Sequence, residues 1–178
     1  MGFPKALLEL QGETFLDRLI GLFAPRCRPV IVVVGAAAGT VRAGSRRAGE
    51  AQFTVNADYA RGQLSSMQCG LGAVPPEAGG VLFTLVDHPR VKPATLDRLL
   101  AGAGPLRIPR HNGRRGHPIY FSTALAAEFL ALDPGATARE VVDRHAPEVE
   151  YVDVDDPGVL EDIDRPEDYR RLVEEARP

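Results

Sequence analysis

The chain has 178 residues, a length that fits one domain with a real hydrophobic core. Its formal net charge of −3 at pH 7 excludes the broad basic surface of a nucleic-acid-binding protein. No apolar run reaches the ~18 residues that a membrane span requires, and the N-terminus lacks the pattern of a signal peptide. Cys27 and Cys69 have no disulfide or zinc spacing, so we expect two structural thiols in a cytoplasmic protein.

In chain order, the sequence predicts helices and strands that largely alternate. Helices are expected at residues 15–24, 37–48, 62–74, 93–100, 125–132, 138–145 and 165–176, the first of them with Thr14 as its N-cap. Strands are expected at residues 29–34, 53–55, 80–86, 106–109, 118–121 and 149–154. This order favours an α/β fold of three layers, with a mostly parallel sheet and helices on both faces.

Asp87 follows residues 80–86, the most apolar predicted strand. Because that strand shows no polar alternation, both of its faces should be covered, as in a central parallel strand. Ligands of open α/β sheets gather at the carboxyl ends of strands. A carboxylate at this position is suited to a hard divalent cation such as Mg²⁺. The alternative is that Asp87 only caps the next turn, and the pattern by itself does not choose between them.

A second acidic group lies near the C-terminus, and we expect most of its members to sit in a solvated loop. Asp164 differs because Arg165 and Pro166 follow it, where a helix is predicted to begin. It is therefore either a cap of that helix or a ligand of a cation. The acidic group consists of Asp153, Asp155, Asp156, Glu161, Asp162 and Asp164.

Residues 112–118 form a polar loop in which two glycines flank Arg114 and Arg115. Glycine lets a backbone approach a ligand closely, and arginine grips phosphate or carboxylate with two hydrogen bonds. The alternative is an exposed hairpin turn. His117 beside Pro118 is more typical of a structural histidine than of an acid or base. Asn56, after a short strand, is either a polar ligand or a turn residue.

Taken together, the segments resemble the MobA-like nucleotidyltransferase family, and the nearest branch is the molybdenum cofactor cytidylyltransferase type. The matching segments run in the family's order over nearly the whole chain, so we expect one such domain over residues 1–178 with a Rossmann-like fold. They are residues 2–8 (GFPKALL), 32–35 (VVVG), Asn56, 62–71 (GQLSSMQCGL), 85–89 (LVDHP), 113–118 (GRRGHP) and 162–169 (DIDRPEDY).

The resemblance implies transfer of a nucleotidyl group from an NTP to a small phosphorylated acceptor, with release of pyrophosphate; CMP from CTP to a molybdopterin-type acceptor is favoured. Such chemistry needs in-line positioning and charge neutralisation more than a nucleophilic side chain. By this analogy Mg²⁺ is held by Asp87 and Asp164, while Lys5 neutralises phosphate charge. Asn56 and Ser66 would lie at the nucleotide, and Arg115, Gly116, His117 and Pro118 at the acceptor.

The sequence departs from the family pattern in two places. His88 stands where members of this branch commonly have glutamine. The family opens with a strand and a loop of the form Leu-Ala-Ala-Gly-x-Ser-x-Arg-Met-Gly, whereas this chain opens where that motif would be ending. We therefore expect an N-terminally truncated domain that lacks the first strand and the phosphate-binding loop.

Other functions stay open at this stage. Within the family, the acceptor could be a sugar phosphate or a polyol phosphate, or the reaction could be guanylyl transfer to molybdopterin. Because the glycine-rich loop is absent, a non-catalytic protein that binds a nucleotide or cofactor is a further alternative. Such a protein would act as a partner of a molybdenum enzyme.

Overall fold

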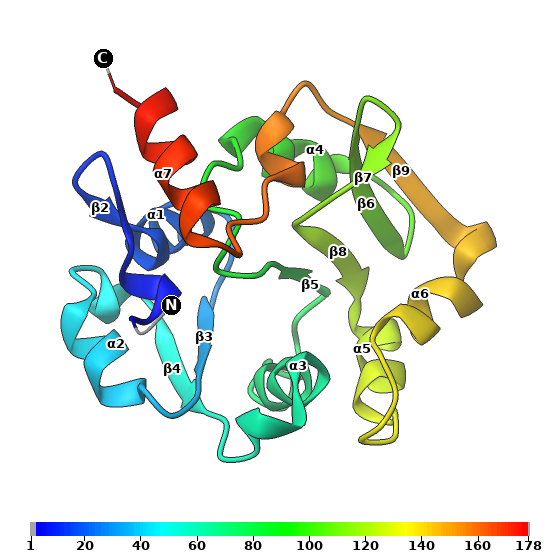
Figure 1. Cartoon of the computed structure of the whole chain (residues 1–178). Coiled ribbons are helices and arrows are strands. Elements are labelled where there is room, and N and C mark those ends of the chain that lie inside the picture. The colour runs from blue at the N-terminus through cyan, green and yellow to red at the C-terminus, as the bar shows by residue number, and fades with distance from the viewer. Residues whose placement is uncertain (1–2, 178) are drawn as a thin grey trace.

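The computed structural model describes residues 3–177 and confirms an α/β fold (Figure 1). The helices are α1 (Phe15–Phe23), α2 (Ala38–Gly44), α3 (Gln63–Leu71), α4 (Pro93–Ala101), α5 (Thr123–Leu130), α6 (Arg139–Arg144) and α7 (Pro166–Glu175). The strands are β1 (Glu9–Leu10), β2 (Glu13–Thr14), β3 (Ile31–Val34), β4 (Gln52–Val55), β5 (Gly80–Phe83), β6 (Leu106–His111), β7 (Arg114–Arg115), β8 (Ile119–Ser122) and β9 (Val149–Asp153). Short 3-10 turns include η1 (Lys5–Leu7), η3 (Tyr59–Arg61) and η5 (Pro157–Leu160).

The strands pair in both directions. β3 pairs in parallel with β4, and β6 pairs in parallel with β9. β5, β8, β6 and β7 follow one another through antiparallel pairs, so a five-stranded sheet forms with β9 on the other edge of β6. Within residues 3–177, β3 pairs only with β4 and β5 only with β8. Figure 1 shows β3 and β4 on one side of the molecule and the larger sheet on the other.

Local sequence explains several of the element boundaries. Thr14 caps α1 as predicted, because its hydroxyl accepts a hydrogen bond of 3.0 Å from the backbone N–H of Asp17. The predicted polar loop at 112–118 contains a tight hairpin between β6 and β7. Its turn residues Asn112 and Gly113 have φ of 50° and 77°, the left-handed pair of a type I′ turn.

The structure differs from the sequence prediction in several elements, among them β5, α3 and an additional hairpin. β5 ends at Phe83 rather than at residue 86, because residues 84–86 find no ladder partner. α3 ends at Leu71, three residues before the predicted end. The β1–β2 hairpin was not predicted, since its strands have only two residues each and carry no periodic signal.

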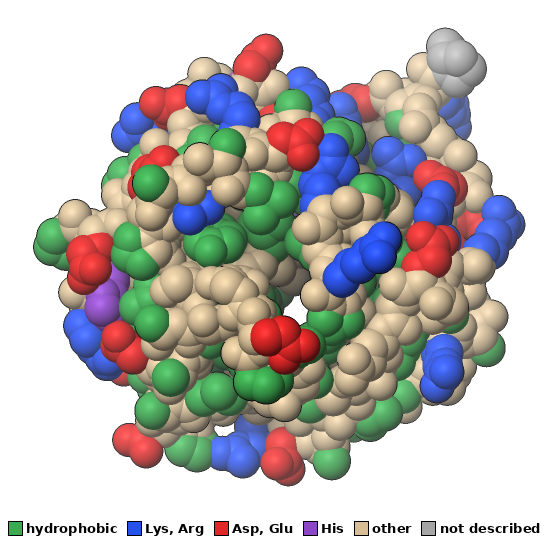
Figure 2. Space-filling model, turned by 180° about the vertical axis from the view of Figure 1, so that it is seen from behind, with side chains coloured by type: hydrophobic (Ala, Val, Ile, Leu, Met, Phe, Trp, Pro, Cys, Tyr) green, Lys and Arg blue, Asp and Glu red, His purple; other side chains and the backbone are tan. Residues whose placement is uncertain are grey.

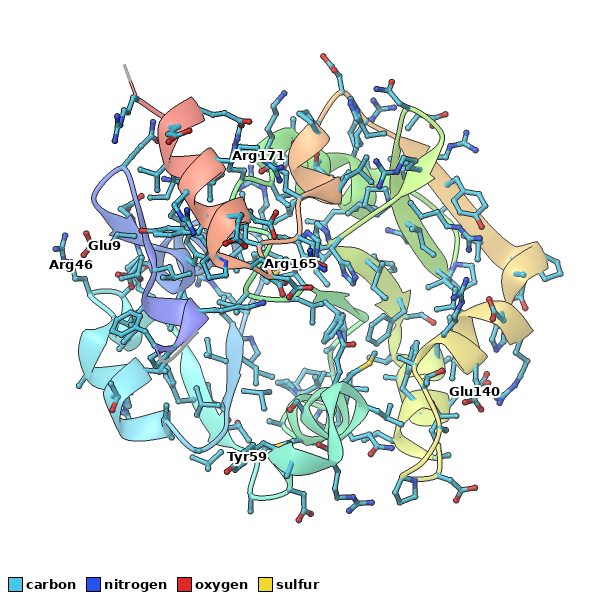
Figure 3. All side chains as sticks on the ribbon, in the orientation of Figure 1. Glu9, Arg46, Tyr59, Glu140, Arg165 and Arg171 are labelled. Atoms are coloured by element: carbon cyan, nitrogen blue, oxygen red, sulfur yellow. The ribbon has the colours of Figure 1, made fainter. Side chains whose placement is uncertain are left out.

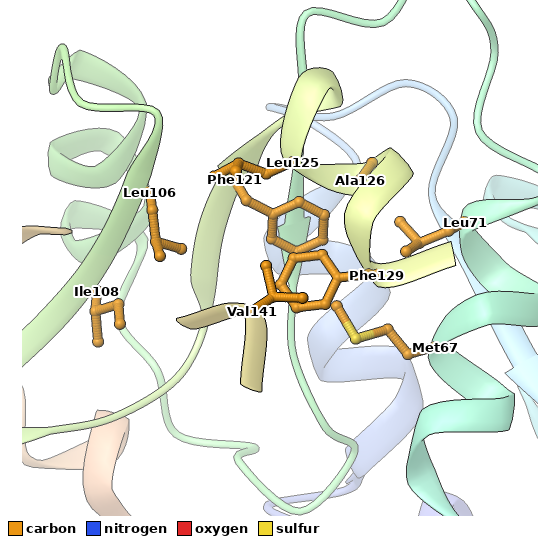
Figure 4. Close-up of a cluster of buried hydrophobic side chains, with 9 residues drawn as sticks. All are labelled: Met67, Leu71, Leu106, Ile108, Phe121, Leu125, Ala126, Phe129 and Val141. Carbon is orange, nitrogen blue, oxygen red and sulfur yellow. The ribbon is translucent and has the colours of Figure 1, made fainter. Parts of the chain in front are cut away.

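Two helical layers cover the faces of β5, as the sequence predicted. Val81 and Phe83 pack with α3 and α5, in the cluster around Met67 and Phe129. Leu82, which points to the other face, packs with Leu96 of α4 and with α1. The cluster under α3, α5 and α6 is the largest buried core in the described chain (Figure 4). It consists of Met67, Leu71, Leu106, Ile108, Phe121, Leu125, Ala126, Phe129 and Val141.

No helix within residues 3–177 has both the length and the apolar character needed to cross a membrane.

Candidate active site

Three carboxylates converge beyond the carboxyl end of β5. Asp87, Asp162 and Asp164 each offer an oxygen atom, and these atoms all lie within 4.8 Å of one another. The backbone N–H of Ile163 donates to the carbonyl of Asp87 at 3.2 Å, which holds the two segments together. Asp87 is partly buried, whereas Asp162 and Asp164 face solvent. The fold therefore brings Asp87 together with two carboxylates that lie 75 and 77 positions later in the chain.

Lys5 is the cation of this cluster. Its Nζ donates to Oδ1 of Asp164 at 2.5 Å and lies 3.5 Å from Oδ2 of Asp87. Burial works against the charged ammonium, but the hydrogen bond to Asp164 and the charges of both carboxylates raise the pKa of Lys5 overall. The hydrogen bond from Lys5 in turn lowers the pKa of Asp164.

The cluster holds more negative charge than Lys5 balances. Burial and the neighbouring charges of Asp87 and Asp164 raise the pKa of Asp162. Oδ1 of Asp87 is buried and has no hydrogen-bond partner in the described chain, an arrangement that costs free energy unless something pairs with the oxygen. A group of carboxylate oxygens, one of which is buried without a hydrogen-bond partner, is a ligand set that suits a hard divalent cation.

Neither Asp87 nor Asp164 serves as a helix cap. Arg165, labelled in Figure 3 where α7 begins, is the N-cap, and its backbone N–H donates to Asp168 at 3.0 Å. At the start of α4, the backbone N–H of Lys92 donates to Asp156 at 2.8 Å. The capping alternative is therefore excluded for both candidate ligands.

Asp156 corrects the expectation that most of the acidic group lies in a solvated loop. Its side chain is 2% exposed and accepts hydrogen bonds from the N–H of Lys92, the hydroxyl of Thr95 at 2.6 Å and the N–H of Gly158 at 3.0 Å. It therefore fixes η5 against the start of α4. No pattern in the sequence distinguishes the two, because Asp155 and Asp156 are adjacent residues of the same type.

Two histidines lie near Asp87, of which His88 is buried and His117 half-buried. The rings of His88 and His117 have centroids 4.9 Å apart, and Nδ1 of each has no hydrogen-bond partner in residues 3–177. Burial, together with the neighbouring His88, lowers the pKa of His117 to about 4, so its ring is neutral at pH 7. Gly116 packs so tightly that an added Cβ would lie 2.1 Å from the carbonyl oxygen of Val159. His117 and Gly116 thus form a fixed wall near Asp87.

Arg115 does not join this wall. It lies in β7, paired with Arg110 of β6, and its guanidinium is 5.7 Å from the ring of Tyr151. The side chain is exposed. The sequence analysis gave an exposed hairpin as an alternative for this loop, and Arg115 lies in such a hairpin.

Asn56 and Ser66 form a second polar group, between β4 and α3. The amide of Asn56 is buried and donates to the hydroxyls of Ser65 at 3.0 Å and of Ser66 at 3.1 Å. Its carbonyl oxygen accepts from the N–H of Asp58 at 2.9 Å. Ser65 was not singled out from the sequence, and the serine pair in residues 62–71 was the signal for it.

Asp162 was named only as one of many acidic residues, although the sequence held a sign of its role. It lies two positions before Asp164 in a segment without helix or strand hydrogen bonding. In extended backbone, residues i and i+2 point to the same side. The spacing Asp-x-Asp therefore predicts two carboxylates that face one ligand.

An acidic cluster with one lysine, beyond the carboxyl end of a strand in an α/β sheet, is an arrangement that suits an enzyme binding a divalent cation together with substrate phosphates. Residues 1–149 match the model of the MobA-like NTP transferase domain. The chain belongs to this family of nucleotidyltransferases.

Comparison with similar proteins supports this assignment over most of the chain. Nicotine blue oxidoreductase from Paenarthrobacter nicotinovorans is 31% identical, over 96% of this chain and 88% of the relative. Molybdenum cofactor cytidylyltransferase from Escherichia coli (strain K12) is 27% identical, over 95% of this chain and 86% of the relative. The crystal structure of Rv0371c from Mycobacterium tuberculosis H37Rv in complex with manganese has a TM-score of 0.80 and 29% identity, over 96% of this chain and 91% of that chain.

Proposed function

We propose that the chain transfers CMP from CTP to a molybdopterin-type acceptor in a reaction that depends on Mg²⁺ and releases pyrophosphate. The observation that carries the proposal is the cluster of Asp87, Asp162 and Asp164 with Lys5. Carboxylates of this kind hold Mg²⁺ together with substrate phosphates. The solved structure of the mycobacterial relative is a complex with manganese, which supports a divalent cation in this chain, and Mg²⁺ is our choice of that cation.

The residues divide into three roles. Asp87 and Asp164 would hold the metal, with Asp162 as a third ligand, and the bound metal would supply charge neutralisation at the triphosphate. Lys5 would neutralise the remaining phosphate charge. The hydroxyl of Ser66 would lie at the nucleobase, with Asn56 holding that hydroxyl in place through its 3.1 Å hydrogen bond.

The acceptor would lie against Gly116 and His117, and against Pro118, which follows them in the chain. A neutral, half-buried His117 offers a hydrogen-bonding ring without a charge. Arg115 would reach the acceptor from the exposed hairpin as a phosphate ligand. The Escherichia coli relative supports CTP and molybdopterin chemistry. A molybdenum enzyme that receives the product is the partner we propose.

Pyrophosphate release tests the proposed reaction. The chain is incubated with Mg²⁺, a molybdopterin-type acceptor and CTP, GTP or ATP in turn, and we expect release with CTP above the other two. In parallel reactions, a sugar phosphate or a polyol phosphate replaces the molybdopterin-type acceptor. Release with one of those acceptors alone would reject the pterin, and nucleotide binding without release would favour a non-catalytic binding protein.

A second candidate function is reduction of an organic substrate, because the relative with 31% identity is an oxidoreductase. A reduced nicotinamide nucleotide carries a pyrophosphate, as CTP carries a triphosphate, so the same carboxylates and Lys5 would face it. Oxidation of NADH or NADPH in the presence of nicotine blue, measured by absorbance, would support this candidate. Turnover there without pyrophosphate release would replace the transferase proposal.

A further inference from the structure

The two oxygens of the Asp87 carboxylate face different surroundings. Oδ2 lies 3.5 Å from Nζ of Lys5, on the side of the carboxylate cluster. Oδ1 is buried, has no hydrogen-bond partner within residues 3–177, and lies 3.8 Å from Nε2 of His88. A cation bound through Oδ2 would leave Oδ1 for a second partner. His88 offers a hydrogen-bond donor on that side.

His88 is the most completely buried histidine of the described chain. Its side chain is 7% exposed, and among the four histidines in residues 3–177 it alone is buried. On the face of the molecule that Figure 2 shows, histidine reaches the surface in one patch, whereas acidic and basic side chains are spread widely. A polar ring costs free energy to bury unless it makes hydrogen bonds. The burial of His88 beside Asp87 therefore points to a use for its ring.

Packing fixes the ring of His88. Its centroid lies 4.9 Å from that of the His117 ring, with an angle of 40° between the two planes. His117 is itself held in place, because its backbone N–H donates to the carbonyl of Val159 at 2.9 Å. The ring of His117 also meets the ring of Phe83 edge-on, with 6.1 Å between the centroids. The imidazole of His88 is therefore presented to Asp87 from a rigid support.

The surroundings of the two ring nitrogens favour a hydrogen on Nε2. Nδ1 of His88 is buried and has no hydrogen-bond partner in the described chain. A hydrogen on Nδ1 would therefore be a buried donor without an acceptor, which is unfavourable. Nε2 instead faces Oδ1 of Asp87, a buried acceptor that lacks a donor. The two atoms are complementary when the neutral ring carries its hydrogen on Nε2.

The separation between these two atoms fits a hydrogen bond that tightens on ligand binding. At 3.8 Å it is too long for a hydrogen bond in the structure as it stands. A shift of about 0.6 Å in the carboxylate would bring it to ~3.2 Å, the upper end of the usual range. Hydrogen bonds at catalytic groups are often long in the free protein and shorten in the complex.

We propose that His88 is a positioning residue of the metal site: its Nε2–H donates to Oδ1 of Asp87 and so directs Oδ2 toward the cation. The imidazole acts through Asp87 and does not touch the cation. Carboxylates that bind metals are commonly held by such a second hydrogen bond, and losing it weakens metal binding. The inference rests on the metal site of the proposed function, but it does not depend on which nucleotide or acceptor is used.

Two variants and one control separate hydrogen bonding from packing. His88→Gln keeps an N–H donor at the end of the side chain, whereas His88→Leu keeps bulk and removes both nitrogens. We expect His88→Leu to weaken Mn²⁺ binding by about tenfold and His88→Gln by less than about threefold, in isothermal titration calorimetry. His145→Leu is the control, because His145 contacts Glu128 and Glu148 instead of the metal cluster. We expect its Mn²⁺ affinity to match that of the original chain.

The ring of His88 gives a second readout, in the original chain without metal. Long-range ¹H–¹⁵N correlations of a chain labelled at histidine show which ring nitrogen carries the hydrogen, and the signals of His88 are those missing in His88→Gln. We expect the hydrogen on Nε2, with a downfield shift of that proton when Mg²⁺ is added and the bond to Asp87 shortens. A hydrogen on Nδ1 would overturn the proposal even if His88→Leu failed to fold.

The calorimetry distinguishes this inference from the metal site itself. Unchanged Mn²⁺ affinity in His88→Leu is the result that packing alone predicts, and it would overturn the inference while leaving the proposed function in place. Equal losses in His88→Leu and His88→Gln would overturn it too, as would a similar loss in His145→Leu. Failure of the original chain to bind Mn²⁺ would reject the metal site, and the role of His88 with it.

Discussion

One carboxylate oxygen of Asp87 is buried without a hydrogen-bond partner, and the carboxylates of Asp162 and Asp164 lie close to it. Replacing it with asparagine keeps the size of the side chain and removes the charge. We expect Asp87→Asn to weaken Mn²⁺ binding by about tenfold or more, measured by isothermal titration calorimetry. Asp153→Asn is the matched control, because Asp153 pairs with Arg110 on the exposed face of β9. Unchanged Mn²⁺ affinity in Asp87→Asn would remove Asp87 from the metal site.

Gly116 is required for a steric reason. A methyl group there would lie 2.1 Å from the carbonyl oxygen of Val159, which belongs to η5 and accepts the N–H of His117. We expect Gly116→Ala to lower the free energy of unfolding by about 1–3 kcal/mol, measured in urea. Gly135→Ala is the control, since nothing lies within 4 Å of its added Cβ. Equal stability of the two variants would mean that residues 116–118 can shift away from η5 at no cost in free energy.

The sequence predicts the residues of the site unevenly. Asp87 is a candidate from strand chemistry, because it follows an apolar strand, but that pattern fits a cation ligand and a cap of the next turn equally well. Lys5 follows only from the resemblance, since a terminal lysine carries no local signal, whereas the position of Asp164 before a predicted helix leaves a cap and a ligand both open. The hydrogen bond that brings Lys5 to Asp164 spans 159 positions and depends on the whole fold.

At the scale of elements, η5 and α4 are joined by Asp156, which satisfies three donors inside the protein. We expect Asp156→Ala to lower the free energy of unfolding by about 3 kcal/mol, because it leaves buried N–H and O–H groups unpaired. Chemical denaturation measures this loss. Asp155→Ala serves as the control, since Asp155 is exposed and contributes only its backbone carbonyl to Lys92. Similar stabilities would mean that water replaces the lost hydrogen bonds.

Most helices were predictable because apolar residues recur at helical spacing, as in α1 and α4. The strands were harder. Residues 84–86 are as apolar as β5 itself, and only the lack of a pairing partner ends the strand at Phe83. The direction of strand pairing could not be predicted from the sequence either. Alternation of strands and helices favours parallel pairs, yet β8 pairs antiparallel with both β5 and β6. The reason is that α5 follows β8 rather than preceding it.

At the scale of the whole molecule, stability should be divided between the two sheets. The five-stranded sheet packs on the large core around Phe121 and Phe129, whereas β3 and β4 form a two-stranded sheet beside a cavity. Two-stranded sheets are marginally stable by themselves. Their main support here is the smaller cluster of Leu16, Ile20 and Val41. We therefore expect the β3–β4 region to open locally before the molecule unfolds as a whole.

Hydrogen exchange followed by mass spectrometry checks this expectation. Peptides that cover residues 31–55 should exchange by local opening, with protection about tenfold or more below that of peptides covering residues 106–122. A low concentration of urea should speed exchange in the second region more steeply, because global unfolding exposes more surface than local opening does. Equal protection and equal urea dependence in both regions would mean that the two sheets unfold as one unit, and that the cavity does not weaken the link between them.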